Sequence, residues 1–153
     1  MATNTLIQKL FGKDETGVGE DGVTQSNRRE LEQFIASEQI ADGDLVCLDI
    51  SKSTAGERMY HVKKLKTDAG VTAVAIGVAD QDADADARIN VVIKGYKSGA
   101  NIATGAAIGE RFVGTSTAGR GDVLVNSSTL PALGYVVTTA SANAADVIII
   151  KQF

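Results

Sequence analysis

Four aspartates occupy alternate positions of the segment DQDADADA, residues 80–87: Asp80, Asp82, Asp84 and Asp86. Carboxylate oxygens are the ligands that Ca²⁺ and Mg²⁺ prefer, so the run suggests a calcium binder or a metal-dependent hydrolase. The EF-hand loop needs a glycine at its sixth position and a bidentate glutamate at its twelfth. Counted from Asp82, those positions hold Ala87 and Ile93, and the frame that begins at Asp80 fails in the same way. The sequence therefore predicts no metal site, with weak Ca²⁺ binding by the loop left open.

The chain has one histidine, His61, and one cysteine, Cys47. A nucleophilic triad would need a Ser or Cys and a carboxylate to converge on His61, and no nucleophile elbow or other catalytic motif supports one. The pair is also too small a ligand set for a structural zinc site. Cys47 lies in the apolar run LVCLDI, which favours a small buried side chain over a reactive thiol. We predict no catalytic residue and no cofactor, and we expect a protein that is not an enzyme.

Three short motifs have simpler structural interpretations. Arg120-Gly121-Asp122 matches the integrin-binding tripeptide, but the same residues suit a tight turn before a strand. Asn126-Ser127-Ser128 matches a glycosylation sequon in a chain whose N-terminus does not read as a signal peptide. The glycines of residues 98–109 lack the Lys-Ser/Thr that a phosphate-binding loop requires.

From residue 43 onward the chain has the pattern of a β protein. Short Val- and Ile-rich segments alternate with turns such as TAG, KSG and AGRG, and no helical stretches lie between them. We expect strands within residues 45–50, 58–66, 71–79, 87–96, 122–126, 133–140 and 146–153. A chain of 153 residues is about the size of one domain. The predicted fold is mainly β, a small barrel or sandwich.

The N-terminal part is predicted to be an arm followed by one short helix. Residues 12–25 hold four glycines and four acids and little that could be buried, which is typical of a flexible tether. Before this tether, one helical face would carry four apolar residues, Leu6, Ile7, Leu10 and Phe11. We expect this apolar knob to dock on a neighbouring subunit or another protein, or to fold back on its own domain. The helix is expected from about Arg28 to Glu38, with Asn27 and Glu30 as a capping box.

Two segments of the chain resemble each other. Residues 75–96, AIGVADQDADADARINVVIKGY, align without a gap with residues 132–153, ALGYVVTTASANAADVIIIKQF. Upstream, ADGDLVCL resembles AIGERFVG, and Ala55–Arg58 resembles Ala118–Arg120. The pattern predicts a duplicated β-unit, about 41–96 and 105–153, with pseudo-twofold symmetry. Because the second copy of the acidic loop has no carboxylate, the aspartates are interpreted as solvated and dispensable to the fold.

Composition and charge narrow the range of functions. The net charge of −4 argues against nucleic acid as the main partner, because phosphate binding needs clustered Lys and Arg. No window approaches 18 uninterrupted apolar residues, so no membrane span is expected. Three Tyr, four Phe and no Trp leave few stacking platforms for sugars.

As a whole, the chain resembles the small capsid decoration (cement or head-stabilising) proteins of tailed bacteriophages. The resemblance covers most of residues 24–153 and rests on SNRRELEQFIASEQIADGDLVCLDISKS, GERMYHVKK, VAIGVA, INVVIKGY, ANIATGAAIGERFVG, ALGYVVTTA and ADVIIIKQF. It implies a non-enzymatic β-rich protein, often a trimer, that binds the outside of a phage head and clamps neighbouring major capsid subunits. In such proteins the arm reaches across the shell or adds to a neighbouring sheet; here the arm is residues 1–25 and the decoration domain residues 26–153.

The sequence thus favours a structural protein of the virion, on the outer capsid surface, as a homo-oligomer without nucleic acid or membrane partners. The partner-binding candidates are the apolar knob and two arginines: Leu6, Ile7, Leu10, Phe11, Arg28 and Arg29. The alternative is a receptor- or glycan-binding β-barrel of a phage tail, fibre or cell-surface assembly. A small metal-dependent hydrolase centred on the aspartate run is the third hypothesis.

Overall fold

The computed structural model describes residues 29–67, 75–124 and 131–150. These residues form nine strands and one short helix: β1 (Glu30–Ala36), β2 (Leu45–Leu48), α2 (Ala55–Tyr60), β3 (His61–Lys64), β4 (Ala75–Ala79), β5 (Arg88–Asn101), β6 (Arg111–Gly114), β7 (Gly121–Val123), β8 (Gly134–Val136) and β9 (Ala144–Ile149). The prediction of a mainly β protein with one short helix is confirmed for the fold class, but the described helix lies at Ala55–Tyr60 and not at the predicted position. Within the described ranges, no helix is long and apolar enough to cross a membrane.

The strands form one sheet in the order β1-β3-β2-β4-β5-β9-β8-β6-β7. Strand β1 pairs in parallel with β3 and antiparallel with β5, so the first five strands close on themselves. The fold is therefore a β-barrel, which decides between the barrel and the sandwich that the sequence left open. Closure pairs both sides of β1, which would otherwise be an exposed sheet edge.

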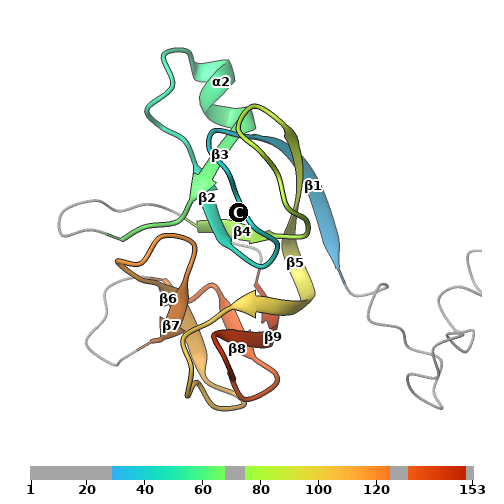
Figure 1. The fold of residues 1–153 in the computed structure, drawn as a ribbon, viewed down its shortest axis with the longest axis vertical. Helices are drawn as coiled ribbons and strands as arrows, with labels where there is room; N and C mark the ends of the chain where they lie inside the picture. The colour runs from blue at the N-terminus through green and yellow to red at the C-terminus, as the bar shows by residue number, and fades with distance from the viewer. Residues whose placement is uncertain (1–28, 68–74, 125–130, 151–153) are drawn as a thin grey trace, which may run out of the picture.

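The strand order confirms the duplication. Strands β3-β2-β4-β5, which together with β1 we call the first unit, are followed by β9-β8-β6-β7, the second unit, in mirrored order. The antiparallel pairings β2–β3, β2–β4 and β4–β5 recur as β6–β7, β6–β8 and β8–β9. Figure 1 shows the two units one above the other, with the long strand β5 running from one into the other.

Strand β5 serves both units. Its first half pairs with β1 and β4, and its second half pairs with β9. In the second unit, the end of β5 takes the position that β1 has in the first. Asn101 pairs with Ala144, and Ile102 forms a parallel bridge to Gly121, just as β1 pairs in parallel with β3. A single 14-residue strand therefore replaces a separate closing strand in the second unit.

The turn before β2 is repeated before β6, as the similarity of ADGDLVCL to AIGERFVG predicts. Gly43 and Gly109 have φ angles of 86° and 85°, a left-handed conformation that favours glycine. In each turn a carboxylate accepts the backbone N–H three residues earlier: Asp44 from Ala41 at 3.0 Å, and Glu110 from Ala107 at 2.7 Å. The similarity of Ala55–Arg58 to Ala118–Arg120 has no such counterpart, because the first segment is helical and the second is a turn.

The gapless alignment of the two units is wrong by one residue after the acidic loop. Ala83 donates to the carbonyl of Ile40 as Ala140 donates to that of Ala106, which places 83 opposite 140. On the next strand, however, Val78 pairs with Val92 while Tyr135 pairs with Ile148, which places 92 opposite 148 rather than 149. The loop of the second unit is therefore one residue shorter. Since side chains alternate between the two faces of a strand, this slip decides which isoleucines of β9 are buried.

The buried residues form two clusters that share strands. One cluster fills the first barrel and includes Phe34, Ile40, Val46 and Val91. The other includes second-unit residues such as Phe112 and Ile149 together with first-unit residues Leu45, Cys47, Val78 and Val92. Strands β2, β4 and β5 are therefore buried on both faces, one inside their barrel and one against the second unit. That double burial explains why their sequences are continuous apolar runs rather than alternating ones.

The helix predicted from about Arg28 to Glu38 is a strand in the structure. β1 pairs in register with β5 from Leu31–Val92 to Ile35–Arg88, and its alternate residues Phe34 and Ala36 are buried. The spacing of apolar residues fits both a helix and a strand, and the pairing partners on both sides decide for the strand. The strand predicted within residues 58–66 begins only at His61, because residues up to Tyr60 are helical.

Candidate interaction surfaces

The described residues contain no group of three or more His, Cys, Asp or Glu side chains that could hold a metal ion. His61 lies at the start of β3, and its Nδ1 is 2.8 Å from the carbonyl oxygen of Glu57, which fits a ring that donates to the end of α2. Cys47 is buried, as predicted, and burial raises the pKa of its thiol to about 11. A thiol with that pKa remains protonated and unreactive near neutral pH.

The acidic loop is less dispensable than its sequence suggests. Lys97 of β5 is buried, and its ammonium lies 2.8 Å from a carboxylate oxygen of Asp42 and 3.4 Å from one of Asp80. Asp80 also pairs with Arg29 at 3.0 Å, and Asp82 accepts the backbone N–H of Asp42 at 2.7 Å. A buried cation needs such carboxylate partners to offset its lost hydration. The first half of the aspartate run therefore stabilises the first barrel, which corrects the interpretation of a purely solvated loop.

The second half of the run is exposed and contributes little that is specific. Asp84 and Asp86 lie at the surface, and the backbone of Asp86 has a positive φ of 64°. Aspartate tolerates that left-handed conformation better than most side chains. These two residues shape the turn that leads into β5.

Most of the predicted partner-binding residues lie outside the described residues: Leu6, Ile7, Leu10, Phe11 and Arg28. Arg29 is described, and its guanidinium binds Asp80 within the same chain. The role of Arg29 in binding a partner stays a prediction. The division between arm and body near residue 25 stays a prediction.

The largest surface feature that sequence reasoning missed is the connection between β2 and β3, residues 49–60, which we call the tip. It contains α2, a helix with no buried residue. A capping box holds its start: Thr54 Oγ1 accepts the N–H of Glu57 at 3.2 Å, and the Glu57 carboxylate accepts the N–H of Thr54 at 3.1 Å. Arg58 Nε donates to the Lys52 carbonyl at 2.6 Å and ties the two sides of the loop. The tip is thus an ordered projection rather than a loose loop.

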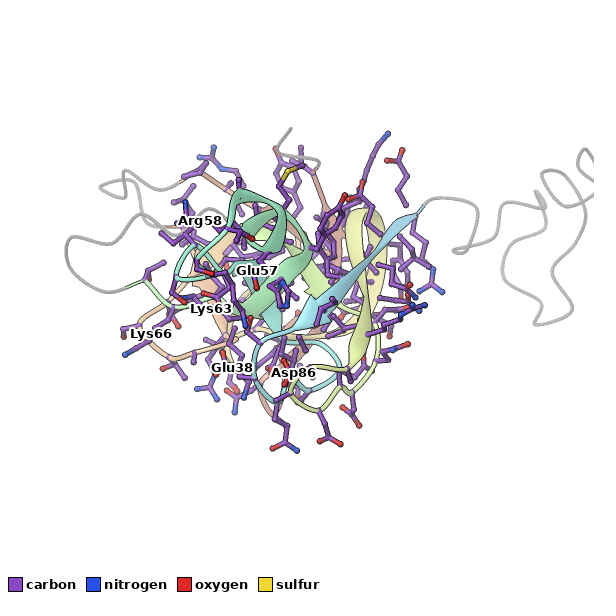
Figure 2. The ribbon with its side chains drawn as sticks, turned by 90° about the horizontal axis from the view of Figure 1, so that it is seen from above. Glu38, Glu57, Arg58, Lys63, Lys66 and Asp86 are labelled. Carbon is purple, nitrogen blue, oxygen red and sulfur yellow. The ribbon has the colours of Figure 1, made fainter. Side chains whose placement is uncertain are left out.

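The tip presents three large apolar side chains to solvent. Ile50, Met59 and Tyr60 are 68%, 64% and 59% exposed. The segment 49–66 carries five basic and two acidic residues, whereas the whole chain has a net charge of −4. Figure 2, which looks down on the α2 end, shows Arg58, Lys63 and Lys66 toward one side of the molecule. Exposed apolar side chains with basic neighbours in the sequence are the composition of a binding surface rather than of a solvated loop.

A second exposed apolar area lies on the outer face of β8 and β9. Tyr135 and Ile148 are cross-strand neighbours and are 43% and 42% exposed. Their counterparts in the first unit, Val78 and Val92, are fully buried because the second unit covers them. Nothing in the described part of the chain covers the second pair in the same way.

Two signals in the sequence could have revealed the tip. Ser53-Thr54-Ala55-Gly56-Glu57 contains the Thr-x-x-Glu spacing of a capping box. The loop between β2 and β3 also has twelve residues, 49–60. The corresponding loop of the second unit, between β6 and β7, has only six, 115–120. An insertion in one copy of a repeat points to a role outside the common fold.

Comparisons with known proteins identify a similar fold but no family. No protein-family model matches the sequence, and no curated protein matches it. Among solved structures, the chain is similar to the crystal structure of the N base of head fiber gp8.5 in bacteriophage phi29. The TM-score is 0.53 at 14% sequence identity, and the match covers 80% of this chain and 94% of that one. At this identity the likeness establishes a shared fold.

Proposed function

We propose that the protein is a structural component of a phage virion that binds the outer surface of the head and reinforces the shell by contacting neighbouring major capsid subunits. The observation that carries this proposal is the fold shared with the base of a phage head fiber over 80% of the chain. The sequence resemblance to capsid decoration proteins points in the same direction on other grounds. Both concern proteins of a phage head.

The surface features fit an attachment role. The tip carries exposed apolar side chains, and the sequence of residues 1–25 predicts an apolar knob on a polar tether. Each contact is small, but copies repeated over a lattice of shell subunits bind with high total avidity. A rigid double unit carrying two kinds of contact can bridge neighbouring subunits.

Quantitative mass spectrometry of purified virus particles tests the location. We expect the ratio of this chain to the major shell protein to be one, or a simple fraction set by the lattice. A few copies per particle would instead place the protein at the tail or portal and favour receptor binding. Complete absence from particles would contradict the proposal.

Deletion of residues 1–23 tests the contribution of the arm to attachment. We expect the truncated protein to remain folded and to unfold cooperatively, because Glu30 is the first residue of the described strand β1. Its occupancy on isolated shells should fall severalfold. The matched control replaces the same residues by a Gly/Ser tether of equal length, which separates loss of arm contacts from loss of bulk. Normal occupancy of both variants would exclude an attachment role for the arm.

A further inference from the structure

The tip exposes large apolar side chains to water in the free protein, which is energetically unfavourable. Its three largest apolar side chains are each more than half exposed, although a capping box and hydrogen bonds from Arg58 fix the position of α2 in the loop. Three large exposed apolar side chains within the eleven residues 50–60 are more than the singly scattered ones that need no explanation. We propose that in the free protein the N-terminal arm of the same chain supplies a partner for them, with the segment from Leu6 to Phe11 covering Ile50, Met59 and Tyr60.

Charge supports this occupant. The tether that follows the knob, residues 12–25, carries four acids and one base. The tip and β3 carry the opposite excess, four bases and two acids in residues 49–64. Lys63 and Lys64 are paired with Asp49 and Asp44, but Lys52 and Arg58 have no carboxylate partner in the described part of the chain. An acidic tether beside these two cations gains attraction at the rim of an apolar contact.

The length of the chain outside the structure supports docking within one molecule. The arm leads into β1, and α2 packs against β1 itself. Strand β1 has seven residues and spans roughly 23 Å, so the tip lies within about one strand length of the root of the arm. Eighteen residues, 12–29, separate the knob from β1, and a flexible chain of that length has a mean span of about 20–25 Å. A tether whose mean span matches the required distance gives a high effective concentration.

The inference concerns the free protein and does not depend on its place in a virion. If the arm covers the tip, the two apolar elements shield each other in solution. Both become available together when a partner binds either one. The protein would then stay soluble before assembly without giving up its apolar contacts.

The chain contains its own probe, because Met1 and Met59 are its two methionines and Met59 lies on the tip. Brief peroxide treatment followed by mass spectrometry measures the oxidation rate of Met59, which follows solvent access. Deletion of residues 2–23 should raise this rate by about threefold or more relative to the full chain. Equal rates in the two proteins would overturn the proposal.

Substitutions in the full chain test the apolar contact and the charge attraction separately. The combined substitution L6S, I7S, L10S and F11S retains the length and charge of the arm and should raise the Met59 rate as the deletion does. Lys52→Glu should also raise the rate, and replacing Asp14 and Glu15 by lysine in the same chain should reverse much of that increase. Failure of the charge reversal to restore protection would argue against the predicted pairing of tether and tip.

Dilution distinguishes the source of the arm. Protection of Met59 that stays constant over a wide range of protein concentration supports docking within one chain. Protection that disappears on dilution would assign the tip to the arm of a second copy and overturn the intramolecular proposal. Ile108→Ser in the full chain is the matched control for the substitutions and should leave the Met59 oxidation rate unchanged. Ile108 is as exposed as Ile50 but lies in the second unit.

Discussion

The two units of this protein share one strand topology but differ in what covers them. The first unit is a barrel closed by a full strand, β1, and the second unit packs against its outer wall. The second unit is closed by the end of β5, and its outer wall carries exposed Tyr135 and Ile148. The features that distinguish the units are therefore the tip, the ion network around Lys97 and the uncovered wall. The common fold provides the scaffold, and the differences provide candidate surfaces.

The sharpest test of the shared architecture is a pair of glycines. A Cβ at Gly77 would overlap the carbonyl oxygen of Val92, and one at Gly134 would overlap that of Ile148. We expect Gly77→Ala and Gly134→Ala each to lower the free energy of unfolding by about 3 kcal/mol or more, because the facing strand must move. Gly56→Ala, in the open helix α2, is the control and should be neutral or slightly stabilising. Urea denaturation measures all three, and a mild effect at either strand glycine would contradict the close approach.

A second test concerns the one-residue slip. Val92 and Ile148 are structural counterparts, but Val92 is fully buried and Ile148 is 42% exposed. Val92→Ala should cost about 2 kcal/mol, and Ile148→Ala less than about 1 kcal/mol. Ile149→Ala should be more costly than either, because Ile149 is buried. Equal costs at Ile148 and Ile149 would favour the gapless alignment that the structure rejects.

The acidic run offers a third comparison, within a single loop. Asp80→Asn removes a charge that faces both Lys97 and Arg29, and should destabilise the protein by about 1 kcal/mol. Asp84→Asn should change stability by less than about 0.5 kcal/mol, because Asp84 is a surface residue. Thermal melts at low and high salt check this, and the Asp80 effect should shrink as salt rises. A destabilisation at Asp84 as large as that at Asp80 would contradict the assigned ion pairs.

Acid sensitivity should arise in both units. Burial raises the pKa of Asp146, but hydrogen bonds from Ser98, Tyr96 and the Gly99 N–H outweigh it and leave that pKa below its usual value. For Asp49, burial is likewise outweighed by hydrogen bonds from Ser51 and by Lys63, so its pKa also lies below the ordinary range. A carboxyl group whose pKa is lower in the folded than in the unfolded protein stabilises the fold at pH values above its unfolded pKa of about 4. That stabilisation is lost as the pH falls through the folded-state pKa.

The corresponding measurement is urea denaturation at a series of pH values. The free energy of unfolding should decline below about pH 4, and the double variant D49N and D146N should show a flatter decline. An unchanged slope in that variant would show that other carboxyls dominate the acid response.

The smallest expected effect is that of removing the tip. Replacing residues 50–60 by the five residues 116–120 of the second unit, which keeps the buried Asp49, should cost about 1 kcal/mol or less, because no residue of α2 is buried. Calorimetry of the chimera measures this. Loss of cooperative unfolding would mean that the tip is required for the barrel and is not an added binding element.

Several structural expectations from the sequence were correct because they depend on local pattern. Alternating or continuous apolar runs predicted most of the strands, and the apolar setting of Cys47 predicted its burial. The similarity of two segments predicted the duplication, since equal turn chemistry at Gly43 and Gly109 requires equal backbone conformations. The role of Arg29 in binding another protein stays a prediction; within the chain its guanidinium pairs with Asp80, 51 positions away.

The errors share one physical cause, which is that pairing partners are distant in sequence. Residues 30–36 satisfy a helical spacing as well as a strand spacing, and only β3 and β5 on either side decide between them. The slip in β9 arises from one residue in a loop, which no local preference fixes. Asp80 looked dispensable because its partner Lys97 is buried by the fold and not by its neighbours in the chain.

The sequence by itself determined the β character, the duplicated unit and the turns, because backbone propensities and side-chain alternation act over a few residues. Tertiary structure alone decided that the strands close into a barrel, that the second unit covers one wall and leaves its own exposed, and that α2 projects unburied from the first. Those outcomes depend on which apolar faces meet in space. The surfaces that remain exposed after that packing are the places where binding is to be sought.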